Sequence, residues 1–227
     1  MTVLAALRSR LFRPSVAAVA VVIVAAGCSA PTPTADPLDA TYGIEASGCS
    51  AVSAFGSGIG VAPDLIMTTA HTVAGATGLV VHGEASTSWP ATLVAIDPDL
   101  DLAVLRLDTA VAFLDRRNPD VGEEAWLLTW SNDEGRRARS TVVRGLLRVT
   151  IEDIYLHREG SRRAIEVSGP VVAGDSGGAV VGTDGRIIGL VYAASRERSV
   201  GFALRNEELD RVVASVGQPV PDLPCGP

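Results

Sequence analysis

Short apolar segments separated by turn residues are the feature that most constrains the fold of this 227-residue chain. Turn pairs such as Pro63-Asp64, Asp97-Pro98 and Asp184-Gly185 interrupt the sequence, so few segments are long enough for an amphipathic helix. Eleven runs have the length and the apolar or alternating pattern of strands: 51–61, 65–69, 78–82, 92–96, 102–107, 125–129, 141–150, 163–167, 178–181, 187–192 and 200–204. So many short strands predict an all-β fold, arranged as barrels or as a sandwich.

One segment near the end of the chain predicts a helix. Asn206 is the expected N-cap, and Glu207 and Glu208 would occupy the first turn, where the helix dipole favours negative charge. The apolar face of this helix would consist of Leu209, Val212, Val213 and Val216.

The first 27 residues have the pattern of a secretory signal peptide. Arg8, Arg10 and Arg13 precede an apolar run at 16–26, and its 11 residues are fewer than the roughly 20 that span a bilayer. The segment that ends in Gly27-Cys28 is similar to a bacterial lipobox, which makes Cys28 the expected lipidation site. An uncleaved single-span anchor and ordinary signal cleavage are the alternatives. Each of them places the rest of the chain outside the cytoplasm.

Residues 28–40 predict an extended tether, because they are rich in Pro, Thr and Ala and lack hydrophobic periodicity. The folded domain is expected over 41–227. Removal of the three leader arginines changes the formal net charge from −7 to −10. Such a charge disfavours nucleic acid and anionic surfaces as partners.

The cysteines support an exported domain. If Cys28 carries a lipid, Cys49 and Cys225 remain, and two cysteines in an exported chain suggest a disulfide. Two free thiols are the alternative. The three His and three Cys fall at no metal-ligand spacing, so we expect neither a metal site nor a cofactor.

The most specific motif is Gly174-Asp175-Ser176-Gly177-Gly178, which should arise by chance in about one chain of this length in several thousand. Glycines on both sides of Ser176 let the backbone turn tightly and let a carbonyl group approach. The amides of Gly174 and Ser176 can converge on one oxygen atom. Taken alone, this segment would be interpreted as a plain glycine-rich hairpin turn.

Two other segments supply the groups that a serine nucleophile needs. A serine hydroxyl needs an imidazole to accept its proton, and the imidazole needs a carboxylate to fix its tautomer. His71 directly follows an apolar run, and several aspartates between 97 and 101 precede another. The order His, Asp, Ser along the chain is that of the chymotrypsin architecture.

Five motifs together resemble those of trypsin-like serine proteases of the chymotrypsin clan, and most of all the bacterial HtrA-type members. They are GSGIGV (56–61), TTAHTV (68–73), DPDLDLAVL (97–105), GDSGG (174–178) and GRIIGLV (185–191). The resemblance covers about 51–204. It implies two six-stranded antiparallel β-barrels with a C-terminal helix, and an active site in the cleft between the barrels. It also implies a serine endopeptidase that acts on protein or peptide substrates through an acyl-enzyme.

Carried over position by position, the resemblance makes His71 the general base, Asp101 its orienting carboxylate and Ser176 the nucleophile. The amides of Gly174 and Ser176 would form the oxyanion hole. Asp101 is preferred because the acid of the family directly precedes the small apolar strand, here 102–105. Three other aspartates compete for this role: Asp97, Asp99 and Asp108.

The resemblance also implies a primary specificity pocket. Its floor lies six residues before the nucleophile, at Pro170, and its walls involve Tyr192, Ala193, Ala194 and Gly201. Because Pro170 carries no charge, a preference for Arg or Lys before the cleaved bond has no electrostatic basis. We expect a small or medium apolar residue there.

The chain departs from the family in two respects. Trypsins pair the Asp before the nucleophile with a freed N-terminus, but nothing between Thr41 and Phe55 resembles the activation sequence, so we expect Asp175 to meet an Arg or backbone donors. HtrA proteases also carry a PDZ domain, for which the 23 residues after Leu204 are too few.

Two interpretations stay open at this point. The domain is either an active endopeptidase or a catalytically latent binding protein that keeps the triad, with an esterase as a lesser alternative. Five arginines flank 141–150, either as solvated loop residues or as a substrate patch: Arg136, Arg137, Arg139, Arg162 and Arg163. His82 and His157 lack a catalytic context and are expected at the surface.

Overall fold

The computed structural model describes residues 36–195 and 197–225, which belong to one compact unit. The predicted signal peptide over 1–27, the lipidation site Cys28 and most of the predicted tether lie outside these residues. Within the described ranges, no helix is long and apolar enough to cross a membrane.

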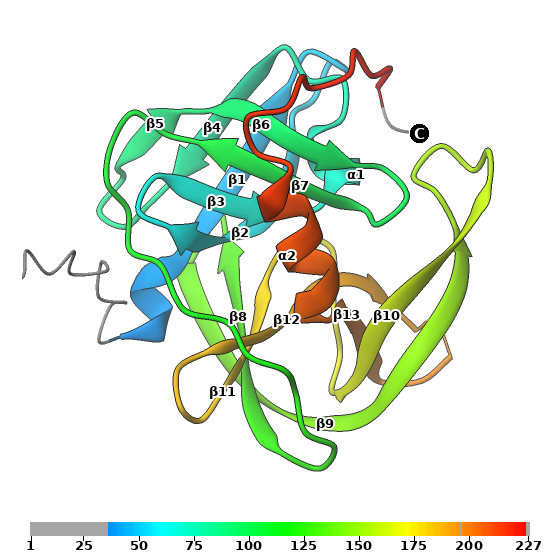
Figure 1. Cartoon of the computed structure of the whole chain (residues 1–227). Coiled ribbons are helices and arrows are strands. Elements are labelled where there is room, and N and C mark those ends of the chain that lie inside the picture. The colour runs from blue at the N-terminus through cyan, green and yellow to red at the C-terminus, as the bar shows by residue number, and fades with distance from the viewer. Residues whose placement is uncertain (1–35, 196, 226–227) are drawn as a thin grey trace, which may run out of the picture. The chain divides into compact units, whose positions relative to one another are not determined.

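The first half of the domain is a seven-stranded antiparallel sheet with the order β5-β4-β1-β2-β3-β7-β6, at the top of Figure 1. Its strands are β1 (Thr41–Ser47), β2 (Ala54–Ala62), β3 (Leu65–Thr68), β4 (Gly78–His82), β5 (Ser88–Pro90), β6 (Thr92–Asp97) and β7 (Leu102–Arg106). A single helical turn, α1 (Ala70–Val73), follows β3 and carries His71.

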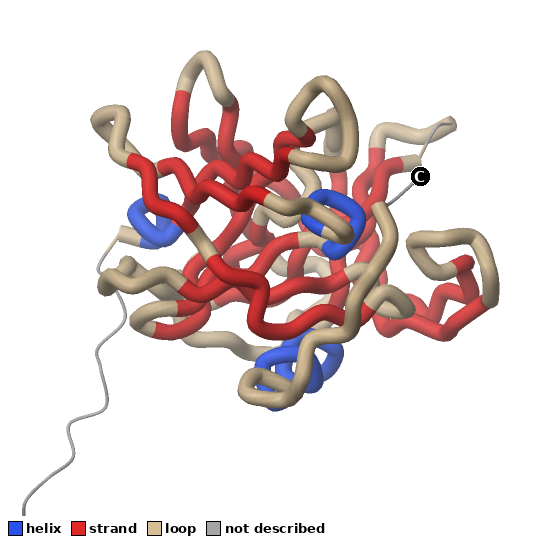
Figure 2. The backbone as a smooth tube through the Cα atoms, turned by 90° about the horizontal axis from the view of Figure 1, so that it is seen from above, coloured by secondary structure: helices blue, strands red, loops and turns tan. Residues whose placement is uncertain are grey.

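The second half is a closed six-stranded barrel with the order β10-β13-β12-β11-β8-β9. Its strands are β8 (Glu124–Ser131), β9 (Gly135–Glu152), β10 (Glu159–Ser168), β11 (Ala179–Gly182), β12 (Ile187–Ala194) and β13 (Val200–Leu204). The long β9–β10 hairpin rises beside the first half in Figure 1. Figure 2, seen from above, shows that strands dominate both halves and that the helical turns lie apart from one another.

The predicted fold class is confirmed: two antiparallel β halves and one C-terminal helix. The strand count differs, since the first half has seven strands rather than six. The sequence does not predict β1 or β5. Gly43, Glu45 and Ser47 interrupt the apolar pattern of β1, and β5 has only three residues.

The ordered domain begins before Thr41, so the tether prediction is wrong for its last residues. Pro37–Ala40 forms a 3-10 helix, η1, whose cap is Asp36, with its Oδ1 accepting a hydrogen bond from the Leu38 amide at 2.9 Å. Ala40 is fully buried, and Asp39 pairs with Arg136 of β9 at 2.9 Å. These long-range contacts cannot be seen in the local composition.

The C-terminal helix α2 (Asn206–Ala214) contacts β6 and β7 of the first half and β10 and β12 of the second. Asn206 is its first residue and not its N-cap, because its side-chain amide donates to the Ile187 carbonyl at 3.0 Å. Leu209 and Val212 are buried, as the apolar face predicts. In Figure 1, α2 lies in front of the junction of the two halves.

One apolar core runs through both halves and holds them together. It includes Ile59 and Met67 from the first half with Leu128 and Leu190 from the second, and each is at most 3% exposed. Burial of each such side chain contributes about 1.5–3 kcal/mol. The two sets of strands therefore form one cooperative body, across which a site can be built.

Cys49 and Cys225 form a disulfide in the structure, with their Cα atoms 5.5 Å apart. The tail segment that carries Cys225 lies on Gly75, two residues after the end of α1, and a Cβ added to Gly75 would come within 2.5 Å of the Cys225 amide. Gly75 also has a φ of +71°, which favours glycine.

The disulfide predicts a large loss of stability for the Cys49→Ser/Cys225→Ser variant. The bridge closes a loop between residues 176 positions apart, which in the chain-entropy model contributes at most about 5 kcal/mol. We expect a clear decrease in the denaturant midpoint under oxidising conditions, and the same decrease when the wild-type domain is reduced. Two titratable thiols in the oxidised wild type, with unchanged midpoints, would support the free-thiol alternative instead.

Candidate active site

His71 and Asp101 meet at two points. Asp101 Oδ1 accepts a hydrogen bond from the His71 amide at 2.8 Å, and Oδ2 lies 2.7 Å from His71 Nδ1. Asp101 is 5% exposed and has a φ of 60°, a left-handed conformation that costs a non-glycine residue about 1 kcal/mol. The double contact fixes the imidazole ring with its proton on Nδ1, so Nε2 faces outward as an acceptor.

The competing aspartates have other partners. Asp97 accepts from the Leu100 amide at 3.0 Å, and Asp99 pairs with Arg158 at 2.8 Å. Asp108 is exposed at the surface. Within the described part of the chain, Asp101 is thus the only one of the four aspartates that contacts His71.

Ser176 lies in a tight turn whose shape depends on glycine. The Gly177 amide donates to the Val191 carbonyl at 2.8 Å, which holds the turn on β12. Gly174 and Gly177 have φ values of +92° and +84°. A Cβ on Gly177 would collide with the Ser57 carbonyl, so this position requires a close backbone approach as well as a left-handed conformation.

The amides of Gly174 and Ser176 are free to bind an oxygen atom, since neither donates a hydrogen bond to any described residue. The same holds for the Ser176 hydroxyl, and no hydrogen bond joins it to His71 Nε2 in the described structure. Such bonds often tighten only when substrate is bound. The two elements are neighbours, because a Cβ on Gly56 would meet both the Ser176 carbonyl at 3.1 Å and the Thr72 side chain at 3.1 Å.

Ser57 of β2 joins the nucleophile turn to the first half. Its amide donates to the Ser176 carbonyl at 2.8 Å, and its hydroxyl donates to the Gly174 carbonyl at 2.7 Å. The same hydroxyl accepts from the Trp130 amide of β8 at 2.9 Å. Ser57 is fully buried, so its loss would leave several buried groups unpaired. Ser57 was not predicted as a site residue, although a polar side chain inside the GSGIGV strand motif is a visible signal.

The partner that Asp175 requires is Arg139 of β9. Arg139 Nη2 pairs with Asp175 Oδ2, which also accepts from the Val172 amide at 2.8 Å. Arg139 Nη1 donates to the Pro170 carbonyl at 3.1 Å. Asp175 is 2% exposed, so this pair replaces the buried ion pair that trypsins make with their N-terminus.

The five arginines lie on β9 and β10 rather than in loops, which corrects the sequence prediction. Arg136 pairs with Asp39 at 2.9 Å, and Arg137 pairs with Glu134 at 3.2 Å. Arg162 is 2% exposed and donates to the Asp99 and Glu152 carbonyls at 2.8 and 3.0 Å, with its guanidinium 5.2 Å from the centre of the Tyr192 ring. Most of these charges are therefore held by internal contacts.

Of the residues of the predicted pocket, Gly201 is the one that faces Val171. Ala194 of β12 and Gly201 of β13 are cross-strand neighbours. A Cβ on Gly201 would collide with the Val171 side chain, whereas Pro170 is exposed. Val171 rather than Pro170 thus occupies the space facing Gly201. Ala193 pairs with Phe202, next to buried Tyr192, and burial raises the pKa of the Tyr192 hydroxyl.

No group of three or more His, Cys, Asp or Glu side chains that could hold a metal ion occurs among the residues that the structure describes. His82 contacts Glu45 at 3.0 Å and is half-buried, and His157 is exposed and stacks on Tyr155.

The profile of the trypsin-like peptidase domain matches residues 56–190, which include His71, Asp101 and Ser176. The chain belongs to this family. It therefore carries a trypsin-like serine protease domain, as the five motifs predict.

Among known relatives, serine protease Rv3671c of Mycobacterium tuberculosis is 29% identical over 177 residues, which cover 75% of this chain and 44% of the relative. A Chlamydia pneumoniae protein named "Probable periplasmic serine endoprotease DegP-like" is 28% identical over 70% of this chain and 33% of its own length. The chain thus spans less than half the length of these curated relatives.

The solved structures of Rv3671c protease have the same fold. The active form gives a TM-score of 0.78 at 26% identity, covering 84% of this chain and 87% of that one. The inactive form gives a TM-score of 0.69 at 27% identity, covering 80% of this chain and 90% of that one.

The Arg139–Asp175 pair predicts that Arg139→Gln lowers both stability and reactivity. Removing one partner of a buried pair costs roughly 3–5 kcal/mol, and the lower end applies here because Arg139 is 31% exposed. Arg137→Gln, which breaks an exposed pair on the same strand, is the matched control and should cost less than about 1 kcal/mol. Chemical denaturation measures the stability of the two variants, and the rate of fluorophosphonate labelling measures their reactivity. Equal effects of the two variants would contradict the assignment of Arg139.

Proposed function

We propose that this domain is a serine endopeptidase in which His71, Asp101 and Ser176 form the catalytic triad. The observation that carries the proposal is the two-point contact of Asp101 with His71, beside a turn whose Gly174 and Ser176 amides donate to none of the described residues. A base that is held in one orientation and two free amide donors are the groups that acyl transfer requires.

The reaction then follows from these positions. Ser176 Oγ attacks the substrate carbonyl while His71 Nε2 accepts its proton, and the Gly174 and Ser176 amides stabilise the oxyanion. The imidazolium gives the proton to the departing amine, which leaves an acyl-enzyme on Ser176. Water, activated by the same base, hydrolyses the ester and restores the hydroxyl.

The closer match to the active form of Rv3671c protease supports an assembled site, with a TM-score of 0.78 against 0.69 for the inactive form. The second candidate is a latent binding protein. The missing hydrogen bond between the Ser176 hydroxyl and His71 favours it, although substrate binding can complete such a contact.

We also propose that the domain works outside the cytoplasm, tethered by a lipid on Cys28 after removal of residues 1–27. The leader pattern and the lipobox-like segment support this placement, together with the disulfide between Cys49 and Cys225. One relative carries the word periplasmic in its name. The substrates would then be exported or envelope proteins.

Labelling with a fluorophosphonate probe tests the activity on residues 29–227. We expect the wild type to be labelled and Ser176→Ala and His71→Ala to lose labelling entirely. Asp101→Asn should slow labelling by about 10³–10⁴-fold, because it allows the wrong imidazole tautomer. His157→Ala, which changes an exposed histidine that stacks on Tyr155, is the matched histidine control and should react like the wild type. A folded wild-type domain that is not labelled would support the latent candidate.

A separate prediction concerns which side chain the enzyme prefers immediately before the cleaved bond. The contact of Val171 with Gly201 and the absence of a carboxylate among the described pocket residues favour a small or medium apolar side chain. Val171→Ala should open the pocket and shift the preference toward Leu or Phe by about tenfold, since one or two methylenes change discrimination by 1–3 kcal/mol. Val172→Ala, at the exposed neighbouring position, should leave the profile unchanged. A peptide-library profile dominated by Arg or Lys would contradict the prediction.

A further inference from the structure

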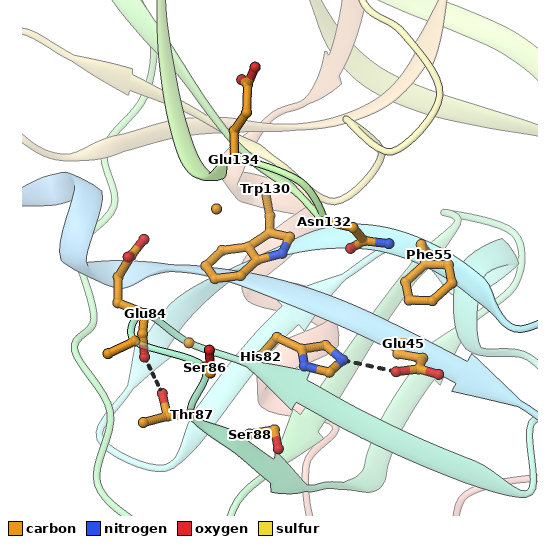
Figure 3. Close-up of a pocket in the computed structure, with 13 residues that line it drawn as sticks. Glu45, Phe55, His82, Glu84, Ser86, Thr87, Ser88, Trp130, Asn132 and Glu134 are labelled. Carbon is orange, nitrogen blue, oxygen red and sulfur yellow. Dashed lines mark hydrogen bonds and ion pairs between the residues drawn. The ribbon is translucent and has the colours of Figure 1, made fainter.

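Two adjoining cavities lead from the nucleophile turn onto β1 and β4 of the first half. The smaller has a volume of about 290 Å³, and its lining includes Gly174 and Gly56. The larger, of about 650 Å³, is drawn in Figure 3. Both are lined by Phe55, Trp130 and Asn132, so they adjoin, and the two together are called here the β1–β4 groove.

The β1–β4 groove begins on the leaving-group side of the site. The departing amine must lie beside His71, which gives it a proton. Gly56, in the wall of the smaller cavity, lies against Thr72, the residue after His71, and against the Ser176 carbonyl. The acyl side is assigned to the predicted pocket, where Val171 and Gly201 of the second half lie in contact. A peptide that continues past the cleaved bond therefore enters this groove.

The aromatic part of the groove is built before any ligand arrives. The Trp130 amide is bonded to the buried Ser57 hydroxyl at 2.9 Å, and the indole packs on Gly43, where a Cβ would come within 2.5 Å of the ring. Phe55 is 43% exposed, which is unusual for a large apolar side chain. In Figure 3, Trp130 lies in the middle of the group, with Phe55 and Asn132 on one side and Glu84 on the other.

The charged groups in the lining of the larger cavity are carboxylates. They are Glu45, Glu84 and Glu134, and no Arg lines this cavity among the residues that the structure describes. Glu45 accepts hydrogen bonds from the side chains of Ser53 and His82, which lower its pKa and keep it ionised at neutral pH. Glu84 and Glu134 are 52% and 68% exposed, which leaves them open to a ligand.

Two arginines at the margin reduce this negative charge without cancelling it. Arg137 pairs with Glu134 at 3.2 Å and also lines the smaller cavity. Arg136 Nε is 3.8 Å from Glu84, but its Nη1 pairs more closely with Asp39. The Glu45 and Glu84 carboxylates therefore remain the strongest attraction for a cation.

We infer that the β1–β4 groove binds the substrate segment that follows the cleaved bond and selects an Arg or Lys within its first four residues. Glu45 is the cross-strand neighbour of Phe55, and β4 lies one strand further. At about 4.8 Å between strands and 3.3 Å per extended residue, these positions are two to four residues beyond the bond. The aliphatic stem of the basic residue packs on Phe55 and Trp130, and its charge faces the carboxylates. This inference rests on the proposed protease function.

Peptide binding to the Ser176→Ala variant of residues 29–227 tests the inference without catalysis. Peptides with Val before the uncleaved bond carry either Arg or the neutral isostere citrulline at one of the four following positions, and calorimetry measures their affinity. We expect the Arg peptide to bind about five- to tenfold more tightly at one or two adjacent positions at low salt, with a smaller ratio at 0.5 M salt.

Additional Glu45→Gln and Glu84→Gln substitutions should each reduce the ratio, and together they should bring it close to one. Glu124→Gln, an exposed carboxylate on β8 outside the groove, is the matched control and should retain the ratio. Equal binding of Arg and citrulline peptides at all four positions would overturn the inference. So would a ratio that persists in the Glu45→Gln/Glu84→Gln variant.

Fluorophosphonate labelling of the same groove variants with Ser176 intact separates the two proposals, because the leaving group of the probe is fluoride, so the probe places no peptide segment on the leaving-group side. If the groove variants are labelled like the wild type but no longer prefer Arg peptides in kcat/KM, the result supports both the proposed activity and the groove inference. If the wild type discriminates between the peptides but is not labelled, the groove inference stands and the proposed activity fails.

Discussion

The buried Ser57 hydroxyl group connects the parts on which the site depends. The histidine and the aspartate belong to the first half of the domain, whereas the serine turn belongs to the second. A shift of about 1 Å between catalytic groups can cost 10²-fold in rate. The relative position of the two halves must therefore be held by directional bonds as well as by the apolar core. The hydrogen bonds from Ser57 to the Gly174 and Ser176 carbonyls fix both the distance and the orientation of the serine turn relative to β2.

The Arg139–Asp175 pair adds an electrostatic constraint to the same turn. Arg139 belongs to β9, so the cation that satisfies the buried carboxylate is in place as soon as the barrel closes. A freed N-terminus has to be made by cleavage, whereas an internal arginine needs no processing step. The hydrogen bond from Arg139 to the Pro170 carbonyl extends the constraint to the segment beside the primary pocket.

The sequence predicted those parts of the domain that are encoded by short, contiguous motifs. The turn around Ser176 follows from its glycine pattern, and the helix after Leu204 follows from its apolar face. The pairing of His71 with Asp101 was predicted from the resemblance of their two motifs to those of the family, not from either segment alone. Features that depend on distant partners were not predicted. The η1 turn is ordered by packing against β9, and Val171 was missed because its position depends on Gly201, 30 residues later. The Asn206 side chain bonds to β12 instead of capping its helix, because tertiary contacts override local propensity.

The β9–β10 hairpin holds the loop that carries Asp101 from the opposite half. Buried Arg162 donates to the Asp99 carbonyl at 2.8 Å, and the Ile154 amide donates to the Pro98 carbonyl at 3.3 Å. A buried guanidinium is costly, and the hydrogen bonds of Arg162 go to carbonyl groups rather than to a carboxylate. Asp101 itself has a left-handed conformation that the chain would not adopt unaided. The buried Arg162 and the strained Asp101 backbone therefore belong together. The left-handed conformation that aims Asp101 at His71 persists because contacts from the second half restrain the residues just before Asp101.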